Sequence, residues 1–110
     1  MKVLFDTNAP APLAHWLRGH AVSRTGDFGW QSLENGKLLD VAETAGFDVI
    51  VTCDQNLKYQ QNFADRKIAL VILSTNHWPE LRPVAARIAT VVDFVQRGQV
   101  SRVDVKALGA

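Results

Sequence analysis

Two apolar segments of this chain end in a carboxylate that is followed, two positions later, by an amide. The segment KVLFDTN carries Asp6 and Asn8, and the segment VIVTCDQN carries Asp54 and Asn56. Aspartate and asparagine often cap turns and helix starts through their side-chain oxygens. The same oxygens are the ligands that hard divalent cations prefer. The repeated pattern therefore has two interpretations, turn capping and metal binding.

The elements that must position these residues follow from hydrophobic periodicity and from turn residues. Apolar runs bounded by turn signals predict strands, and they alternate with segments of helical periodicity. Strands that are apolar on both faces are typical of a mostly parallel sheet covered by helices, so we expect a single three-layer α/β domain over residues 1–110. The expected strands are residues 2–6, 20–25, 48–53, 67–73 and an edge strand within 99–108; the expected helices are 10–18, 34–45, 56–66 and 78–98, with a loop at 26–30.

Parallel strands place their carboxyl ends on one edge of the sheet, where ligand sites gather. We expect Asp6 and Asp54 to meet there, together with Thr75 after the following strand. Glu34 begins the helix of residues 34–45 and should arrive at the same edge. Three carboxylates, those of Asp6, Glu34 and Asp54, are thus predicted to converge.

Carboxylates that lie close together repel one another unless a cation neutralises them. Oxygen ligands from Asp, Glu and Asn suit magnesium or manganese. Such an ion activates water for attack on a phosphodiester. No Ser, Cys or Lys beside a base suggests a protein nucleophile, and we expect the single cysteine, Cys53, to pack as a small buried residue.

Composition restricts the remaining function classes. The chain has 110 residues, 47% hydrophobic and 21% charged, with a net charge of +1. This balance predicts a folded domain without long-range attraction for polyanions. No apolar run approaches the length of a membrane span, and residues 1–5 look like a strand rather than a cleavable leader, so we expect a cytoplasmic protein without membrane contact.

The segment that follows Asp54 contains groups suited to a nucleic-acid strand. Lys58 offers a cation for phosphate and Tyr59 offers a ring for stacking. Asn8 and Thr75 are further candidates for substrate binding. A solvated polar helix is the alternative interpretation of residues 56–66.

The same residues carry a resemblance to a known family. The segments MKVLFDTNAP, LENGKLLDVAETAGFDVIVTCDQNL and IALVILS resemble the small PIN-domain-like proteins over residues 1–73. The resemblance implies a magnesium- or manganese-dependent ribonuclease with Asp6, Glu34 and Asp54 as its catalytic, metal-binding residues and Asn56 as a further ligand. Many such proteins are toxins of toxin-antitoxin pairs, so it also implies an antitoxin partner. Dimers are common among them, which makes a homodimer a further expectation.

Three alternatives to the ribonuclease remain open. The first is a catalytically degenerate domain that binds RNA or a protein. Proteins of the resembling family often have a second aspartate where this chain has Asn56, and an amide supplies no charge to a metal ion. A phosphatase that uses the same acidic edge is another. Asp6 and Asp54 acting only as caps is the third. Asp40 and Glu43 compete with Glu34, since they follow it on the same helix.

Overall fold

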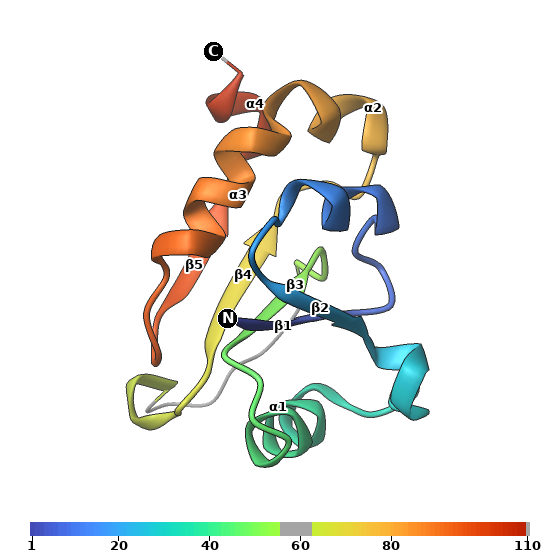
Figure 1. Ribbon diagram of the computed structural model, residues 1–110, viewed down its shortest axis with the longest axis vertical. Helices are drawn as coiled ribbons and strands as arrows, with labels where there is room; N and C mark the ends of the chain where they lie inside the picture. The colour runs from blue at the N-terminus through green and yellow to red at the C-terminus, as the bar shows by residue number, and fades with distance from the viewer. Residues whose placement is uncertain (56–62, 110) are drawn as a thin grey trace.

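The computed structural model describes residues 1–55 and 63–109 and has a five-stranded, entirely parallel sheet at its centre (Figure 1). The strand order is β2-β1-β3-β4-β5. Each strand pairs with its neighbour in parallel register, for example Phe5 with Val51 and Val51 with Val71. This confirms the expected single three-layer α/β fold. The strands are β1 (Lys2–Phe5), β2 (Ala21–Arg24), β3 (Val49–Thr52), β4 (Ala69–Leu73) and β5 (Val100–Val103).

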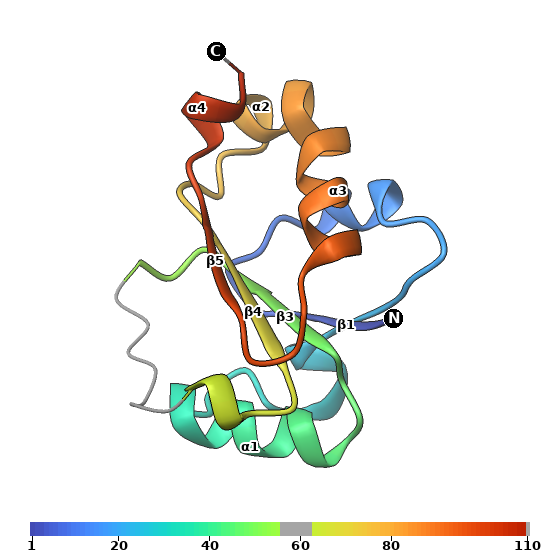
Figure 2. The same cartoon turned by 90° about the vertical axis from the view of Figure 1, so that its left-hand side faces the viewer.

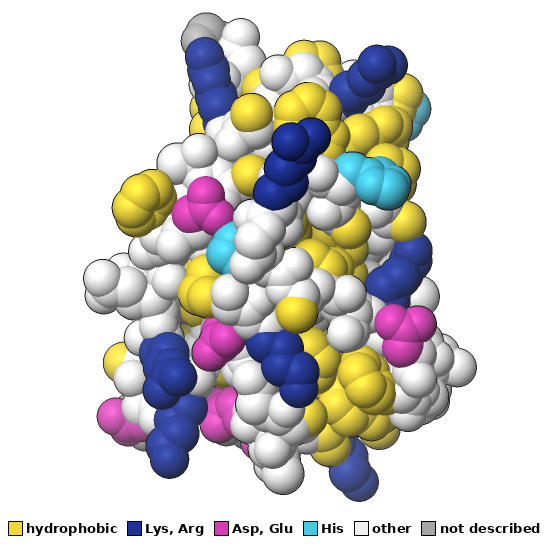
Figure 3. Space-filling model, in the orientation of Figure 1, with side chains coloured by type: hydrophobic (Ala, Val, Ile, Leu, Met, Phe, Trp, Pro, Cys, Tyr) yellow, Lys and Arg dark blue, Asp and Glu magenta, His cyan; other side chains and the backbone are white. Residues whose placement is uncertain are grey.

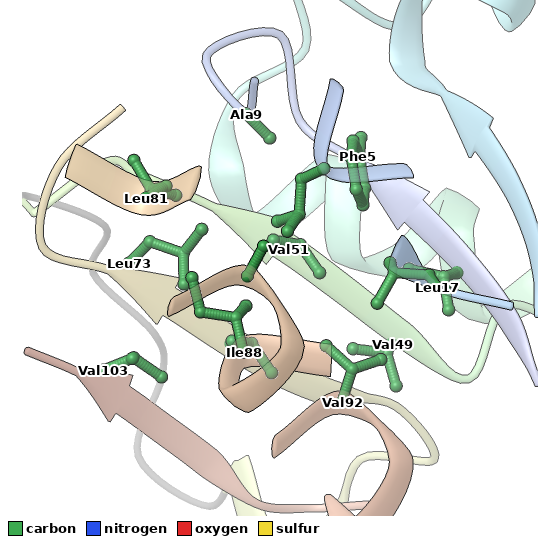
Figure 4. Close-up of a cluster of buried hydrophobic side chains, with 14 of the residues drawn as sticks. Phe5, Ala9, Leu17, Val49, Val51, Leu73, Leu81, Ile88, Val92 and Val103 are labelled. Atoms are coloured by element: carbon green, nitrogen blue, oxygen red, sulfur yellow. The ribbon is translucent and has the colours of Figure 1, made fainter. Parts of the chain in front are cut away.

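Helices cover both faces of the sheet, and each face has its own hydrophobic core (Figure 2). Side chains alternate between the faces along each strand. On one face Val49 and Val51 of β3 pack with Ile88 and Val92 from helix α3 (Ala85–Phe94) (Figure 4). On the other face, Ile50 packs against helix α1 (Asn35–Thr44). Strands buried on both sides need apolar residues throughout, which is why β3 and β4 read as continuous apolar runs.

The helices differ from the sequence-based expectation in several places. The first expected helix is a 3-10 helix, η1 (Ala11–Trp16), which ends before Gly19. A second 3-10 helix, η2 (Thr25–Phe28), occupies part of the expected loop. Of the expected polar helix, only η3 (Phe63–Asp65) lies within the described residues. The edge strand stops at Val103, and α4 (Val105–Leu108) follows it.

The expected long helix of residues 78–98 is broken into three pieces. They are α2 (Trp78–Leu81), the 3-10 helix η4 (Arg82–Val84) and α3. Pro83 lies in the middle piece. Proline has no N–H to donate, and the backbone leaves the helical region one residue later, at Val84 (φ −114°, ψ 11°), so the regular helix does not run through this position. Within the described residues, no helix is long and apolar enough to cross a membrane.

The strand order places a topological switch point between β1 and β3. From β1 the chain moves outward to the edge strand β2, then returns past β1 to form β3, β4 and β5. In open parallel sheets, a crevice forms at the carboxyl ends of the strands where the direction of winding changes. Here those ends carry the residues that follow Phe5 and Thr52.

Candidate functional site

One buried hydroxyl joins the two strand ends at the switch point. Thr52, the last residue of β3, is 0% exposed. Its Oγ1 donates to Asp6 Oδ2 at 2.9 Å and accepts from the backbone N–H of Asp54 at 3.1 Å. The Asp6 backbone also donates to the Val51 carbonyl at 2.9 Å. The Asp6 carboxylate and the Asp54 main chain are therefore held on the same hydroxyl, that of Thr52.

The second oxygen of the Asp6 carboxylate has its own partner. Oδ1 accepts from the backbone N–H of Thr7 at 2.8 Å. The Thr7 hydroxyl lies 3.0 Å from that of Thr25, which is buried at the start of η2. Both carboxylate oxygens are thus oriented by fixed donors while the side chain stays partly exposed. The site presents a positioned carboxylate at the edge of the sheet.

Asn8 reaches across from the end of β1 to the end of β3. Its Oδ1 accepts from the backbone N–H of Cys53 at 3.0 Å and lies 3.3 Å from the Thr52 hydroxyl. The carboxamide oxygen is therefore occupied by protein donors. Among the described residues, the Nδ2 of Asn8 has no hydrogen-bond partner. It is therefore the group through which Asn8 could bind a substrate, the role predicted for this residue.

Cys53 lies between these groups and is protonated at neutral pH. Burial, and secondarily the negative charge of Asp6, raises the pKa of its thiol from 9.0 to about 11. The thiol donates to the Thr75 carbonyl at 3.4 Å. A thiol with this pKa is a poor nucleophile near neutral pH. The residue is half-buried rather than fully buried, and it packs against the core as expected.

The remaining predicted site residues have different surroundings. Glu34 is the exposed N-cap residue of α1, and its side chain makes no capping hydrogen bond. Thr75 Oγ1 accepts from the backbone N–H of His77 at 3.1 Å, which is a turn-capping contact. The other three predicted residues lie outside the described residues: Asn56, Lys58 and Tyr59.

The expected convergence of three carboxylates is not seen in the described residues. Across residues 1–55 and 63–109, no group of three or more His, Cys, Asp or Glu side chains is placed to hold a metal ion. What the structure links, through the Thr52 hydroxyl, is the Asp6 carboxylate and the Asp54 main chain. Asp40 and Glu43, the alternatives to Glu34, both bind Arg66, at 2.9 and 3.0 Å.

The donor set at the switch point fits a hard divalent cation held by few protein ligands. Magnesium and manganese are commonly bound by one or two carboxylates, with water and substrate phosphate completing the shell. Asp6 and Asp54 are the two carboxylate residues that follow the neighbouring strands β1 and β3. Asn8 supplies no free carboxamide oxygen. The magnesium or manganese site stays a prediction, with Asp6 and Asp54 as its ligands.

Sequence reasoning assigned no role to Thr52, although it is the residue that connects the site. The signal was present, because a threonine ends an otherwise apolar run directly before Cys53 and Asp54. A buried hydroxyl needs a hydrogen-bond partner. At the end of this strand, the polar residues that follow the adjacent strand are the candidates. The contact between Thr7 and Thr25 could not be predicted in the same way, because each threonine lies next to a turn, where polar residues are common.

Comparison of the chain with protein-family models, with curated proteins and with solved structures found no match. The resemblance to the PIN-domain-like proteins therefore stays a prediction from the motifs.

Proposed function

We propose that this protein is a magnesium- or manganese-dependent endoribonuclease of the PIN-like type. The observation that carries the proposal is the Thr52 hydroxyl, which joins the Asp6 carboxylate to the backbone N–H of Asp54 at the switch point of a parallel sheet. Ligand sites of open α/β sheets form at that position. The motifs Asp6-Thr7-Asn8 after β1 and Thr52-Cys53-Asp54 at the end of β3 support the same function through the resemblance to the PIN-domain-like proteins.

The residues of the chain have distinct tasks in this reaction. Asp6 and Asp54 hold the cation, and Thr52 keeps the Asp6 carboxylate in position through its hydroxyl. Asn8 Nδ2 donates to a phosphate oxygen of the RNA. The bound cation supplies an activated water and screens the charge that develops on the phosphate. Water adds to phosphorus as the bond to the leaving ribose oxygen breaks, so one strand becomes a phosphate end and a hydroxyl end.

RNA cleavage by the purified protein tests this function. Single-stranded RNA should be cleaved with manganese or magnesium and left intact in EDTA. Asp6→Asn and Asp54→Asn should each lower the rate by at least 100-fold, in line with the loss of a charged group at a metal site (about 10²-fold or more). Asp93→Asn removes a carboxylate from α3 instead, beside His20, and should leave the rate unchanged. Cleavage that persists in Asp6→Asn would exclude this site.

A second function, RNA or protein binding without catalysis, is favoured by one observation. The described residues lack a third acidic side chain at this site, and Asn56 stands where relatives often have an aspartate. Turnover of small phosphate esters without RNA cleavage would instead indicate the phosphatase alternative. The antitoxin partner, the homodimer and the cytoplasmic location stay predictions from the resemblance and the composition.

A further inference from the structure

A pocket that the proposed reaction does not use lies between η1 and α3. It has a volume of about 460 Å³, and its lining residues come from the end of η1 and from the first turns of α3. This volume falls within the range of small-molecule sites, about 300–1,000 Å³. The lining residues are His15, Trp16, Arg18, Ala86 and Ala89.

The polar side chains that line this pocket make no polar contacts that stabilise the fold in the described residues. Throughout the part of the chain that the structure describes, the side chains of His15, Trp16 and Arg18 make no hydrogen bond or ion pair. Trp16 is 43% exposed, which leaves much of a large aromatic surface in water. Basic side chains and hydrophobic atoms lie next to each other on the face where η1 meets α3 (Figure 3). The pocket therefore offers a guanidinium with no partner among the described residues, together with an exposed ring.

Two small residues create the space in front of that ring. Ala86 and Ala89 are three positions apart on α3, so they lie on the same side of the helix and face the pocket together. A larger side chain at either position would fill the pocket. The hollow thus depends on alanine at a helix surface that contacts η1.

The charge of the lining selects the kind of ligand. Of the described residues that line the pocket, Arg18 and His15 are basic and none carries a carboxylate. A second pocket, lined by Trp30 and residues of α1, contains Asp40, whose carboxylate already binds Arg66. An anion with an aromatic ring fits the first pocket and not the second. Aromatic rings flanked by basic groups bind single-stranded nucleic acid, because bases stack on the ring and phosphates contact the cation.

We propose that the pocket between η1 and α3 binds one nucleotide unit of single-stranded RNA. The base stacks on Trp16, the phosphate contacts the Arg18 guanidinium, and His15 supplies a further hydrogen bond. The choice of RNA as the ligand rests on the proposed function, in which RNA is the substrate. The chain passes from Asp6 and Asn8 at the acidic edge into η1, so one short segment connects the two sites.

Fluorescence anisotropy of a labelled oligoadenylate, measured in EDTA, tests the pocket without the cleavage reaction. Trp16→Leu, Arg18→Gln and the pocket-filling Ala86→Leu should each weaken binding at least tenfold. Two controls should bind as the parent does. Ala107→Leu makes the same change on α4, and Arg97→Gln removes an exposed cation near Asp48.

The outcomes separate this pocket from the proposed catalytic site. Binding that is lost in the three pocket variants and retained in Ala107→Leu and Arg97→Gln supports the pocket even if no cleavage is found. Binding that is unchanged in Ala86→Leu and Arg18→Gln overturns it. Oligoglutamate that binds as tightly, with the same loss in the pocket variants, would also overturn it by indicating an acidic protein segment as the ligand.

Discussion

At the scale of single residues, the neighbourhood of Cys53 and Asp6 makes the titration of the thiol a test of the site. The pKa of Cys53 is raised from 9.0 to about 11, first by burial and then by the Asp6 carboxylate. Alkylation of folded protein by iodoacetamide should therefore accelerate with a midpoint near pH 11. Asp6→Asn should move that midpoint downward, and Asp93→Asn should not. An identical midpoint in the parent and in Asp6→Asn would show that the two groups are not neighbours.

The same pKa has a consequence for stability. The folded protein binds the thiol proton more tightly than the unfolded chain, so the unfolded state loses this proton first as the pH rises. The contribution of Cys53 to the free energy of unfolding is therefore complete below about pH 9 and is lost between about pH 9 and 11. Urea unfolding of the parent and of Cys53→Ala should differ in their pH dependence only within that window.

The Thr52 hydroxyl should contribute to stability as well as to the site. Thr52→Val keeps the shape but leaves the Asp6 carboxylate and the Asp54 N–H without their shared partner. Losing a buried hydrogen-bond partner costs about 1–3 kcal/mol, so the free energy of unfolding in urea should fall by that amount. Thr44→Val removes an exposed hydroxyl that donates to the Asp40 carbonyl, and it should change stability by no more than about 0.5 kcal/mol. Equal losses in the two variants would contradict the role given to Thr52.

At the scale of elements, Gly98 fixes the turn between α3 and β5 against η3. It has a φ of +81°, and a Cβ there would lie 2.6 Å from the carbonyl oxygen of Ala64. Gly19 has a nearly identical φ of +83° with nothing within 4 Å of such a Cβ. Gly19→Ala should therefore cost only the backbone strain, about 1–2 kcal/mol.

Gly98→Ala should cost clearly more than Gly19→Ala in urea unfolding, because the close contact adds to the same backbone strain. The difference between the two variants measures the packing of η3 against the start of β5. If both variants lost the same stability, η3 would not be packed closely at this position.

The strands could be predicted from the sequence more accurately than the helices, for a physical reason. A strand buried on both faces must be apolar at nearly every position, and β3 and β4 have that pattern without interruption. Helix periodicity, by contrast, continues from residue 78 to residue 94 even though Pro83 breaks the hydrogen bonding. A 3-10 helix such as η1 has no distinct apolar repeat that separates it from an α-helix of the same length.

At the scale of the whole molecule, the topology explains how much of the site could be predicted. Parallel strands implied that Asp6 and Asp54 share one edge, and the order β2-β1-β3-β4-β5 makes β1 and β3 neighbours at the switch point. Glu34 could not be placed in this way. The sequence specifies that it starts α1, but its distance from the edge depends on the path of η2 and of the residues before α1, which no pattern encodes.

Calorimetric titration of manganese into the purified protein tests the central claim most directly. The parent should bind one ion, and Asp6→Asn and Asp54→Asn should each weaken that binding at least tenfold, because each removes one of the two carboxylates proposed to hold the ion. Asp93→Asn, which removes the α3 carboxylate that contacts His20 Nε2, should bind as the parent does. Absence of manganese binding in the parent, or binding that is unchanged in both Asp6→Asn and Asp54→Asn, would contradict a metal-dependent nuclease at this edge.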